Sequence, residues 1–140
     1  MAVRDIMTSD VVTVQMGETV QEAVEEMLNS RAGSVIVLTG DELSGIITER
    51  DVLVAGAGIE RPFADIPVSR VMSRNLVTIH PDTPLADAIE KMHDYSIKKL
   101  PVIEDDALVG IVTMTDLIYH QHDLVDEAKQ LEQKREMTEE

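Results

Sequence analysis

Two segments of this chain carry side chains whose spacing suits the binding of a sugar and a phosphate. Asp51 follows Thr48 by three residues, and Asp116 follows Thr113 at the same spacing. In a capping box the Thr oxygen accepts a backbone N–H of the first helical turn, and the acid accepts the N–H of the Thr. The same geometry places a carboxylate and backbone N–H groups at a helix start, where they suit ribose hydroxyls and phosphate oxygens respectively. The residues alone allow both a plain helix cap and a ligand site.

Positive charge is scarce in this chain, so its position is informative. Asp and Glu number 27 against 12 Lys and Arg, which gives a formal net charge of -15. Lys98 and Lys99 nevertheless stand side by side before an apolar run, and Arg50 lies inside the first T-x-x-D segment, where the second has Thr115. A phosphate bound by an acidic protein needs positive charge within about 8 to 10 Å, the screening length in salt. Lys98 and Lys99 are therefore candidates for a phosphate site; the alternative is a solvated strand end.

Other kinds of chemistry find no support in the sequence. The chain has no Cys, which excludes disulfides, thiolate metal sites and Cys nucleophiles. His120 and His122 are two residues apart on an expected helix, so they point to different faces and form a poor chelate. The adjacent acids Asp105 and Asp106 fall in an expected turn, which needs polar residues in any case. We predict a protein that is not an enzyme and that holds no metal or cofactor.

Length and charge narrow the partners further. The 140 residues allow one compact domain or two very small ones. The net negative charge would repel a nucleic acid backbone, and an aromatic content of 2% offers few stacking platforms. The start MAVRDIMTSD lacks the pattern of a secretory leader, and no run approaches the roughly 20 apolar residues that span a bilayer, so we expect a cytoplasmic location. The spread of acidic residues fits a halophilic source or ordinary solubility.

The elements that must position these side chains occur twice. Residues 3–53 align without a gap onto residues 68–118 at a constant shift of 65. Hydrophobic class, turn residues and polar identities all stay in register, which indicates duplication of one folding unit. The identical pairs include Val3/Val68, Met7/Met72, Val12/Val77, Thr13/Thr78, Ala23/Ala88, Glu25/Glu90, Met27/Met92, Val37/Val102, Leu43/Leu108, Gly45/Gly110, Ile46/Ile111, Thr48/Thr113 and Asp51/Asp116.

Each copy reads as β-α-β-β-α. Short β-branched runs at 11–14 and 76–79 predict strands, and two apolar runs split by a polar turn predict a hairpin in each copy. A second helix is expected to begin near Arg50 and near Thr115. Thr19 and Glu22 have capping-box spacing at the start of the first helix, and Pro84 stands near the start of its counterpart. The expected buried helix faces are Val20, Ala23, Val24, Met27 and Leu28, and Leu85, Ala88, Ile89 and Met92.

The two copies differ where a phosphate would bind. Gly33 and Ser34 occupy the positions that correspond to Lys98 and Lys99, so positive charge in the first copy must come from Arg50. We therefore expect two half-sites that are not equivalent. A ligand with more phosphates should prefer the site that the lysines face.

The duplicated pattern resembles the CBS (cystathionine-β-synthase) domain family. The resemblance rests on DIM, VVTV and GIITERD in the first copy and on VM, LVTI, KKLPVI and GIVTMTD in the second, and it covers about residues 1–119. It implies an α+β fold of two pseudo-symmetric β-α-β-β-α units that pack through their sheets into one module. The expected domains are residues 1–60 and 68–120, with a linker at 61–67 and an acidic helical tail at 121–140.

The resemblance also implies a function. Paired CBS domains commonly hold AMP, ADP, ATP or S-adenosylmethionine in the cleft between them and regulate another protein. It implies that Asp51 and Asp116 bind ribose and that Thr48 and Thr113 approach phosphate. It also implies that Val12 and Val77, with their neighbours Val11 and Leu76, line an adenine slot; the alternative for these four residues is a plain core strand. We expect a homodimer and an unknown regulated protein as partners, without nucleic acid or membrane. The alternative is a structural adaptor with degenerate clefts.

Overall fold

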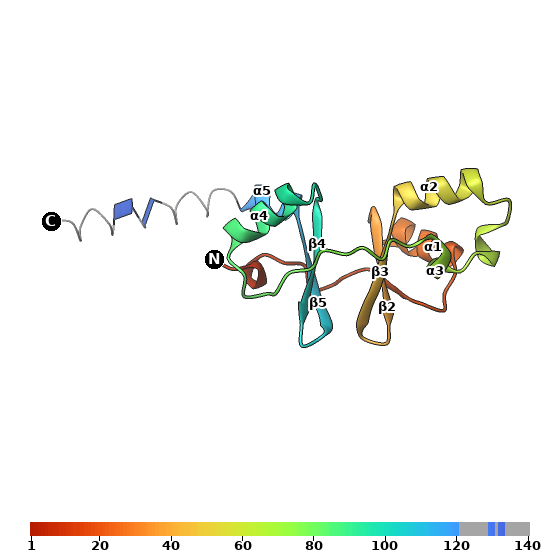
Figure 1. Cartoon of the computed structure of the whole chain (residues 1–140), viewed down its shortest axis with the longest axis horizontal. Coiled ribbons are helices and arrows are strands. Elements are labelled where there is room, and N and C mark those ends of the chain that lie inside the picture. Colours follow the sequence, from red (N-terminus) through yellow and green to blue (C-terminus); the bar gives the residue numbers. More distant parts are fainter. Residues whose placement is uncertain (121–128, 131, 134–140) are drawn as a thin grey trace. The chain divides into compact units, whose positions relative to one another are not determined.

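The computed structural model describes residues 1–120, 129–130 and 132–133. The first copy has the expected order β-α-β-β-α, and the second copy has its helix, hairpin and second helix without the first strand (Figure 1). The elements are η1 (Val3–Asp5), β1 (Thr13–Gln15), α1 (Val20–Ser30), β2 (Ser34–Thr39), β3 (Glu42–Thr48), α2 (Glu49–Gly58), η2 (Phe63–Asp65), α3 (Val68–Val71), α4 (Leu85–Asp94), β4 (Lys99–Glu104), β5 (Ala107–Thr113) and α5 (Met114–Tyr119). The α+β class is confirmed. The expected helical tail falls largely outside the described residues.

The chain forms two compact units whose borders do not follow the repeats. Unit 1 consists of residues 1–9 and 77–104 and of the described residues from 109 onward, and unit 2 of residues 10–76 and 105–108. The first arm, residues 1–9, therefore packs with the second repeat, while the second arm, its counterpart at residues 66–74, packs with the first repeat. Each unit is completed by the arm of the other repeat. The expected domains at 1–60 and 68–120, with a linker at 61–67, stay a prediction.

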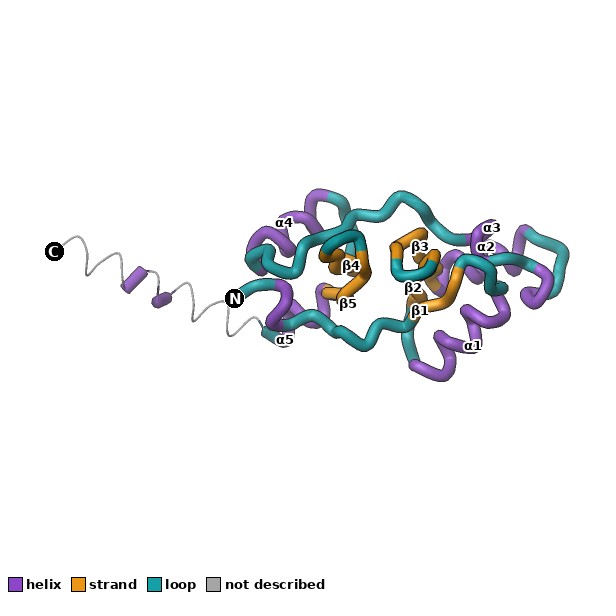
Figure 2. The backbone as a smooth tube through the Cα atoms, turned by 90° about the horizontal axis from the view of Figure 1, so that it is seen from below, coloured by secondary structure: helices purple, strands orange, loops and turns teal. Residues whose placement is uncertain are grey.

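Unit 2 is built on a three-stranded sheet in the order β1-β2-β3. β1 runs parallel to β2, and β2 and β3 form the expected antiparallel hairpin. Its helices lie together on one side of the sheet (Figure 2). The β-branched residues of β2 supply the centre of its core, and the second arm adds two residues to it. The buried members are Val14, Ala23, Met27, Val35, Val37, Ile47, Val68 and Met72.

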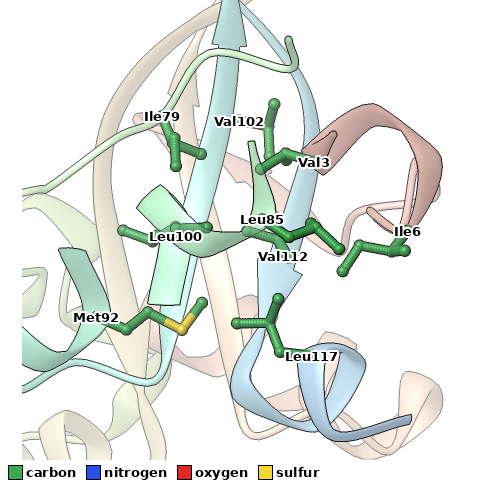
Figure 3. Packing of buried hydrophobic residues seen from close by; sticks show 10 residues of the cluster. Val3, Ile6, Ile79, Leu85, Met92, Leu100, Val102, Val112 and Leu117 are labelled. Atoms are coloured by element: carbon green, nitrogen blue, oxygen red, sulfur yellow. The ribbon is translucent and has the colours of Figure 1, made fainter. Parts of the chain in front are cut away.

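Unit 1 repeats this plan with a smaller sheet, the β4–β5 pair. Val3 and Ile6 of the first arm lie among the core residues of the second repeat (Figure 3). Val3 is fully buried, and its N–H donates to the Thr83 carbonyl oxygen over 2.9 Å. The remaining buried members are Ile79, Leu85, Ala88, Met92, Leu100, Val102, Val112 and Leu117.

The expected strand at 76–79 is wrong as a strand. It is reduced to one parallel bridge between Ile79 and Val102, whereas the corresponding strand in unit 2 runs over three residues. Proline explains the difference. In unit 2 the Ile36 N–H donates to the Val12 carbonyl oxygen over 3.0 Å, and the Met16 N–H donates to the Leu38 carbonyl oxygen over 2.8 Å. The positions that correspond to Ile36 and Met16 in unit 1 are Pro101 and Pro81, which have no N–H to donate.

The expected buried helix faces are correct at their centres and wrong at their flanks. Val20, Ala23 and Met27 are buried in unit 2, as are Leu85, Ala88 and Met92 in unit 1. Leu28 is 73% exposed, Ile89 is also exposed, and Val24 is half-buried. Val24 and Leu28 line a hollow between α1 and α2 instead of contacting the core. The buried stripe is therefore narrower than the sequence pattern.

Candidate functional site

The first T-x-x-D segment forms the junction between β3 and α2. Thr48 is the N-cap of α2; its Oγ1 accepts the Asp51 N–H over 3.2 Å, and Asp51 Oδ2 accepts the Thr48 N–H over 2.9 Å. Both side chains are half-buried. The capping box expected from the spacing is thus present. One carboxylate oxygen of Asp51 is engaged in it, which fixes the orientation of the group.

The second T-x-x-D segment has the same geometry between β5 and α5. Asp116 Oδ2 accepts the Thr113 N–H over 2.9 Å, and Thr113 Oγ1 accepts the Asp116 N–H over 3.1 Å. Thr113 and Asp116 are again half-buried, and Thr115 between them is exposed, as Arg50 is in the first copy. The duplication therefore extends from sequence to individual hydrogen bonds.

Each junction is also tied to the start of the first hairpin strand. The Glu49 N–H donates to the Gly33 carbonyl oxygen over 3.1 Å, and the Met114 N–H donates to the Lys98 carbonyl oxygen over 2.8 Å. The structure therefore places Lys98 next to the second T-x-x-D segment in the same unit. The side chain of Lys98 is exposed and that of Lys99 is half-buried.

The two junctions carry opposite local charge. In unit 1, Lys98 and Lys99 outweigh Asp116, which leaves one net positive charge. In unit 2, Glu49 and Asp51 outweigh Arg50, which leaves one net negative charge. Sequence reasoning missed Glu49, which stands at the first helical position where unit 1 has Met114. The alignment of the two copies could have revealed it. The two junctions therefore differ by two formal charges.

Val12 and Val77 differ in the state of their backbone oxygens. The Val12 oxygen accepts the Ile36 N–H in the sheet, whereas Pro101 offers no N–H at the corresponding place in unit 1. The Val77 oxygen has no hydrogen-bond donor among the described residues. It can accept a hydrogen bond from an external donor such as an aromatic amino group. The sequence predicted both residues as site residues. It did not predict that their oxygens differ, although the missing N–H of Pro101 is the cause.

Val12 also lines a hollow of about 490 Å³ in unit 2. Asp10, Val11, Thr13, Glu26 and Ser30 complete its lining. Neither Thr48 nor Asp51 belongs to this hollow. Within unit 2 the structure thus does not join the Val12 side and the Asp51 side into one pocket.

The duplicated geometry has a counterpart in known proteins. The family model described as CBS domain matches residues 3–58 and residues 68–123. The chain belongs to the CBS domain family. Both copies of the T-x-x-D junction lie inside the matched ranges.

Relatives of this CBS protein include small proteins of similar length. It is 37% identical over 120 residues to the CBS domain-containing protein YhcV of Bacillus subtilis, which covers 86% of this chain and 85% of YhcV. Among solved structures, a putative acetoin utilization protein (AcuB) from Vibrio cholerae matches with a TM-score of 0.81 and 27% identity over 93% of this chain and 96% of the other. The CBS domain pair of protein MJ0100 matches with a TM-score of 0.77 and 27% identity, covering 88% and 97%. That pair was solved in complex with 5'-methylthioadenosine and S-adenosyl-L-methionine.

A second group of polar side chains gathers in the unit 1 half of this CBS pair. One ligand atom each from His80, Asp82 and Glu104 lie within 4.8 Å of one another, a spacing that could hold a metal ion. Arg4 already balances the two acids, because its Nε lies 3.3 Å from Asp82 Oδ1 and an Nη lies 2.6 Å from Glu104 Oε2. The hydrogen bonds to Glu104 and then Asp82 raise the pKa of Arg4 above its usual value. His80 Nδ1 accepts the Asp82 N–H over 3.1 Å. Arg4 already offsets the charge of both carboxylates, so we assign the group to arm docking.

His120 and His122, the pair that makes a poor chelate by its spacing, are not both among the described residues. His120 lies inside the described range and His122 lies outside. Across the described residues, no helix is both long enough and apolar enough to cross a membrane.

Proposed function

We propose that this CBS pair is a regulatory module that binds an adenine nucleotide or related adenosyl compound and passes its state to a partner protein, acting by binding rather than by catalysis. The observation that carries the proposal is the duplicated junction, in which a capped T-x-x-D segment is hydrogen-bonded to the start of the neighbouring hairpin. The complex of the MJ0100 pair with two adenosyl compounds supports the ligand class.

The residues take distinct roles in this proposal. Asp51 and Asp116 accept ribose hydroxyls, because their carboxylates are oriented by the cap and retain further acceptor capacity. Lys98 and Lys99, with Thr113 and Thr115, form the phosphate side in unit 1. The corresponding phosphate side in unit 2 consists of Thr48 and Arg50, opposed by Glu49.

The adenine side uses the segment that enters each sheet. Val77 supplies an apolar surface and a carbonyl oxygen that can accept the adenine amino group. Val12 supplies the surface alone, since its oxygen is bonded to Ile36. Together with the charge difference, this favours the unit 1 residues for the first ligand to bind and for nucleotides with more phosphates.

A thermal-shift screen tests the proposal. The full chain is heated with AMP, ADP, ATP and S-adenosylmethionine, with ribose 5-phosphate and pyrophosphate as controls that carry the sugar or phosphates without the base. A ligand at about 100 times its Kd stabilises the folded state by roughly 2.7 kcal/mol. We expect the adenosyl compounds to raise Tm and the controls to leave it unchanged. No shift with any adenosyl compound at millimolar concentration would favour the adaptor function instead.

We also propose that the exposed apolar faces of the helices bind a second copy of the chain. In unit 2, Leu53 is 73% exposed beside a hollow of about 510 Å³ between α1 and α2. In unit 1 the corresponding residue, Ile118, is 63% exposed, and its neighbour Tyr119 is 82% exposed. Large apolar side chains gathered on equivalent helices are typical of association surfaces. Light scattering that gives only the 15.5 kDa species at micromolar concentration would contradict the dimer.

A further inference from the structure

The two arms are fixed to their units by matching backbone contacts. In unit 1, Thr8 of the first arm and Ile111 exchange both N–H···O bonds, each 2.9 Å long. In unit 2, Ser73 of the second arm and Ile46 do the same over 2.9 and 3.1 Å. We call the Thr8–Ile111 and Ser73–Ile46 hydrogen-bond pairs the pins. Each pin holds the chain just before it passes from one unit into the other.

Glycine at one position in each unit makes the pins possible. A Cβ on Gly110 would lie 2.7 Å from Met7 Sδ and 2.9 Å from the Thr8 carbonyl oxygen. Gly45 has the same relation to the second arm, with Met72 Sδ at 2.6 Å and the Ser73 oxygen at 2.9 Å. Contacts this close to backbone atoms cannot be relieved by a side-chain rotation. The identical Gly pair of the two repeats therefore serves arm docking.

Only a short piece of chain separates each pin from a proposed adenine contact. Thr8 is pinned in unit 1, and Val12, four residues later, is bonded to Ile36 in unit 2. Four residues span at most about 14 Å, so the two attachment points restrain each other. Detaching the first arm would free the chain that enters the unit 2 sheet and raise the entropic cost of holding Val12 in place.

The first arm carries an additional ionic attachment. Arg4 contacts Asp82 and Glu104 in unit 1, and the N–H of Arg4 donates to the Pro81 oxygen over 2.7 Å. The corresponding residue of the second arm is Ser69, which cannot form such ion pairs. The attachment of the first arm therefore depends on salt concentration in a way that the second does not.

From this arrangement we propose that the first arm couples the two units: docking of residues 1–9 in unit 1 and ordering of Val12 in unit 2 stabilise each other. Because coupling free energies are reciprocal, a ligand that orders Val12 also strengthens arm docking. The ligand part rests on the proposed function, whereas the coupling itself does not. Unit 1 would thus sense the occupancy of unit 2 through its own first nine residues.

Hydrogen exchange of single amides tests the coupling without any ligand. Arg4→Ala removes the ionic attachment and leaves the core unchanged, and Arg61→Ala removes the same charge from an exposed site with no ion pair among the described residues. We expect Arg4→Ala to speed exchange of the Thr8 and Ile111 amides by about two- to fivefold, as for loss of surface ion pairs. The decisive amide is Ile36 in unit 2, which should also exchange faster. Arg61→Ala should change none of the three.

A stronger variant covers the case in which Arg4→Ala leaves Thr8 unchanged. Gly110→Ala forces the arm away through its contact with the Thr8 oxygen, whether or not the rest of unit 1 stays folded. If Thr8 exchanges faster in either variant while Ile36 keeps its wild-type rate, the arm does not couple the units and the proposal is wrong.

The ligand experiment is separate. AMP at a concentration near its Kd should slow exchange of Thr8 and Ile111. Asp51→Ala should remove most of that slowing, because the proposal places its origin in unit 2. AMP binding without slower exchange would overturn the ligand-linked part. An absence of binding by AMP, ADP, ATP and S-adenosylmethionine alike would contradict the proposed function but leave the exchange result with Arg4→Ala intact.

Discussion

Replacement of Asp116 separates its two roles, the cap and the ligand contact. Asp116→Ala removes the 2.9 Å bond to the Thr113 N–H, a half-buried bond worth about 0.5 to 1.5 kcal/mol of unfolding free energy. At about 4 °C per kcal/mol for a chain of this size, Tm should fall by about 2 to 6 °C. Asp116→Asn keeps an oxygen that can accept the same N–H, so its Tm should stay within about 2 °C of the wild type.

Affinity should follow a different order. A hydrogen bond from ribose to the charged carboxylate contributes about 1.5 to 3 kcal/mol, so Asp116→Ala should weaken AMP binding in the occupied unit 1 site about 10- to 150-fold. Asp116→Asn, which retains a neutral acceptor, should lose about 1 kcal/mol, or roughly fivefold. Isothermal titration calorimetry at one salt concentration measures both, with Asp51→Asn as the matched change in unit 2. If Asp116→Ala lowers Tm but binds AMP as tightly as the wild type, the segment is a helix cap only.

Three further predictions follow from the differences between the repeats. Lys98→Gln should weaken ATP binding more than AMP binding in calorimetry. Arg50→Gln should change the ratio of the ATP and AMP affinities little, because Glu49 opposes the charge of Arg50. Equal losses for ATP and AMP in Lys98→Gln would show that the lysine does not contact the additional phosphates. Asp106→Gly should raise the unfolding free energy in urea by up to about 1 kcal/mol, since Asp106 adopts a left-handed φ of 65° in the two-residue turn, while Asp41→Gly, outside that region, should bring no gain. Leu53→Glu should shift the molecular mass measured by light scattering from dimer to monomer, and an unchanged dimer would place the interface elsewhere.

Local structure was predictable because it is written in short-range patterns. The spacing and residue types of Thr48 and Asp51 predict a capping box, and the box is present with the expected hydrogen bonds. The hairpins follow from apolar runs interrupted by polar turns. The 65-residue shift then doubles each signal, so that a weak pattern in one copy is supported by the other. The family assignment was obtained from the same local signals.

The partners of these elements were not predictable in the same way. The apolar character of Val3 and Val68 shows that the arms are buried, but periodicity gives no information about which core receives them. Both repeats present the same receiving surface, so the exchange of arms is invisible in their alignment. The prediction that Leu28 is buried is wrong for a related reason. A helix packed on a small sheet buries only a narrow stripe of side chains, and the width of that stripe depends on tertiary packing. Pro101 lies in β4 as expected, but a strand pattern does not indicate that its missing N–H shortens the pairing with the segment at 76–79.

The exchange of arms also determines which truncated fragments of this protein can fold and from which ancestor the duplication could have arisen. A fragment that ends at residue 60 would carry an arm with no surface to receive it and a core without Val68 and Met72. Neither half of the gene encodes a complete folding unit. A single repeat would meet the same shortage alone, but two separate copies could satisfy it by trading their first residues. Fusion of such copies into one chain would preserve every contact and make the partner permanent, so that the duplication converts an association between molecules into a feature of one polypeptide.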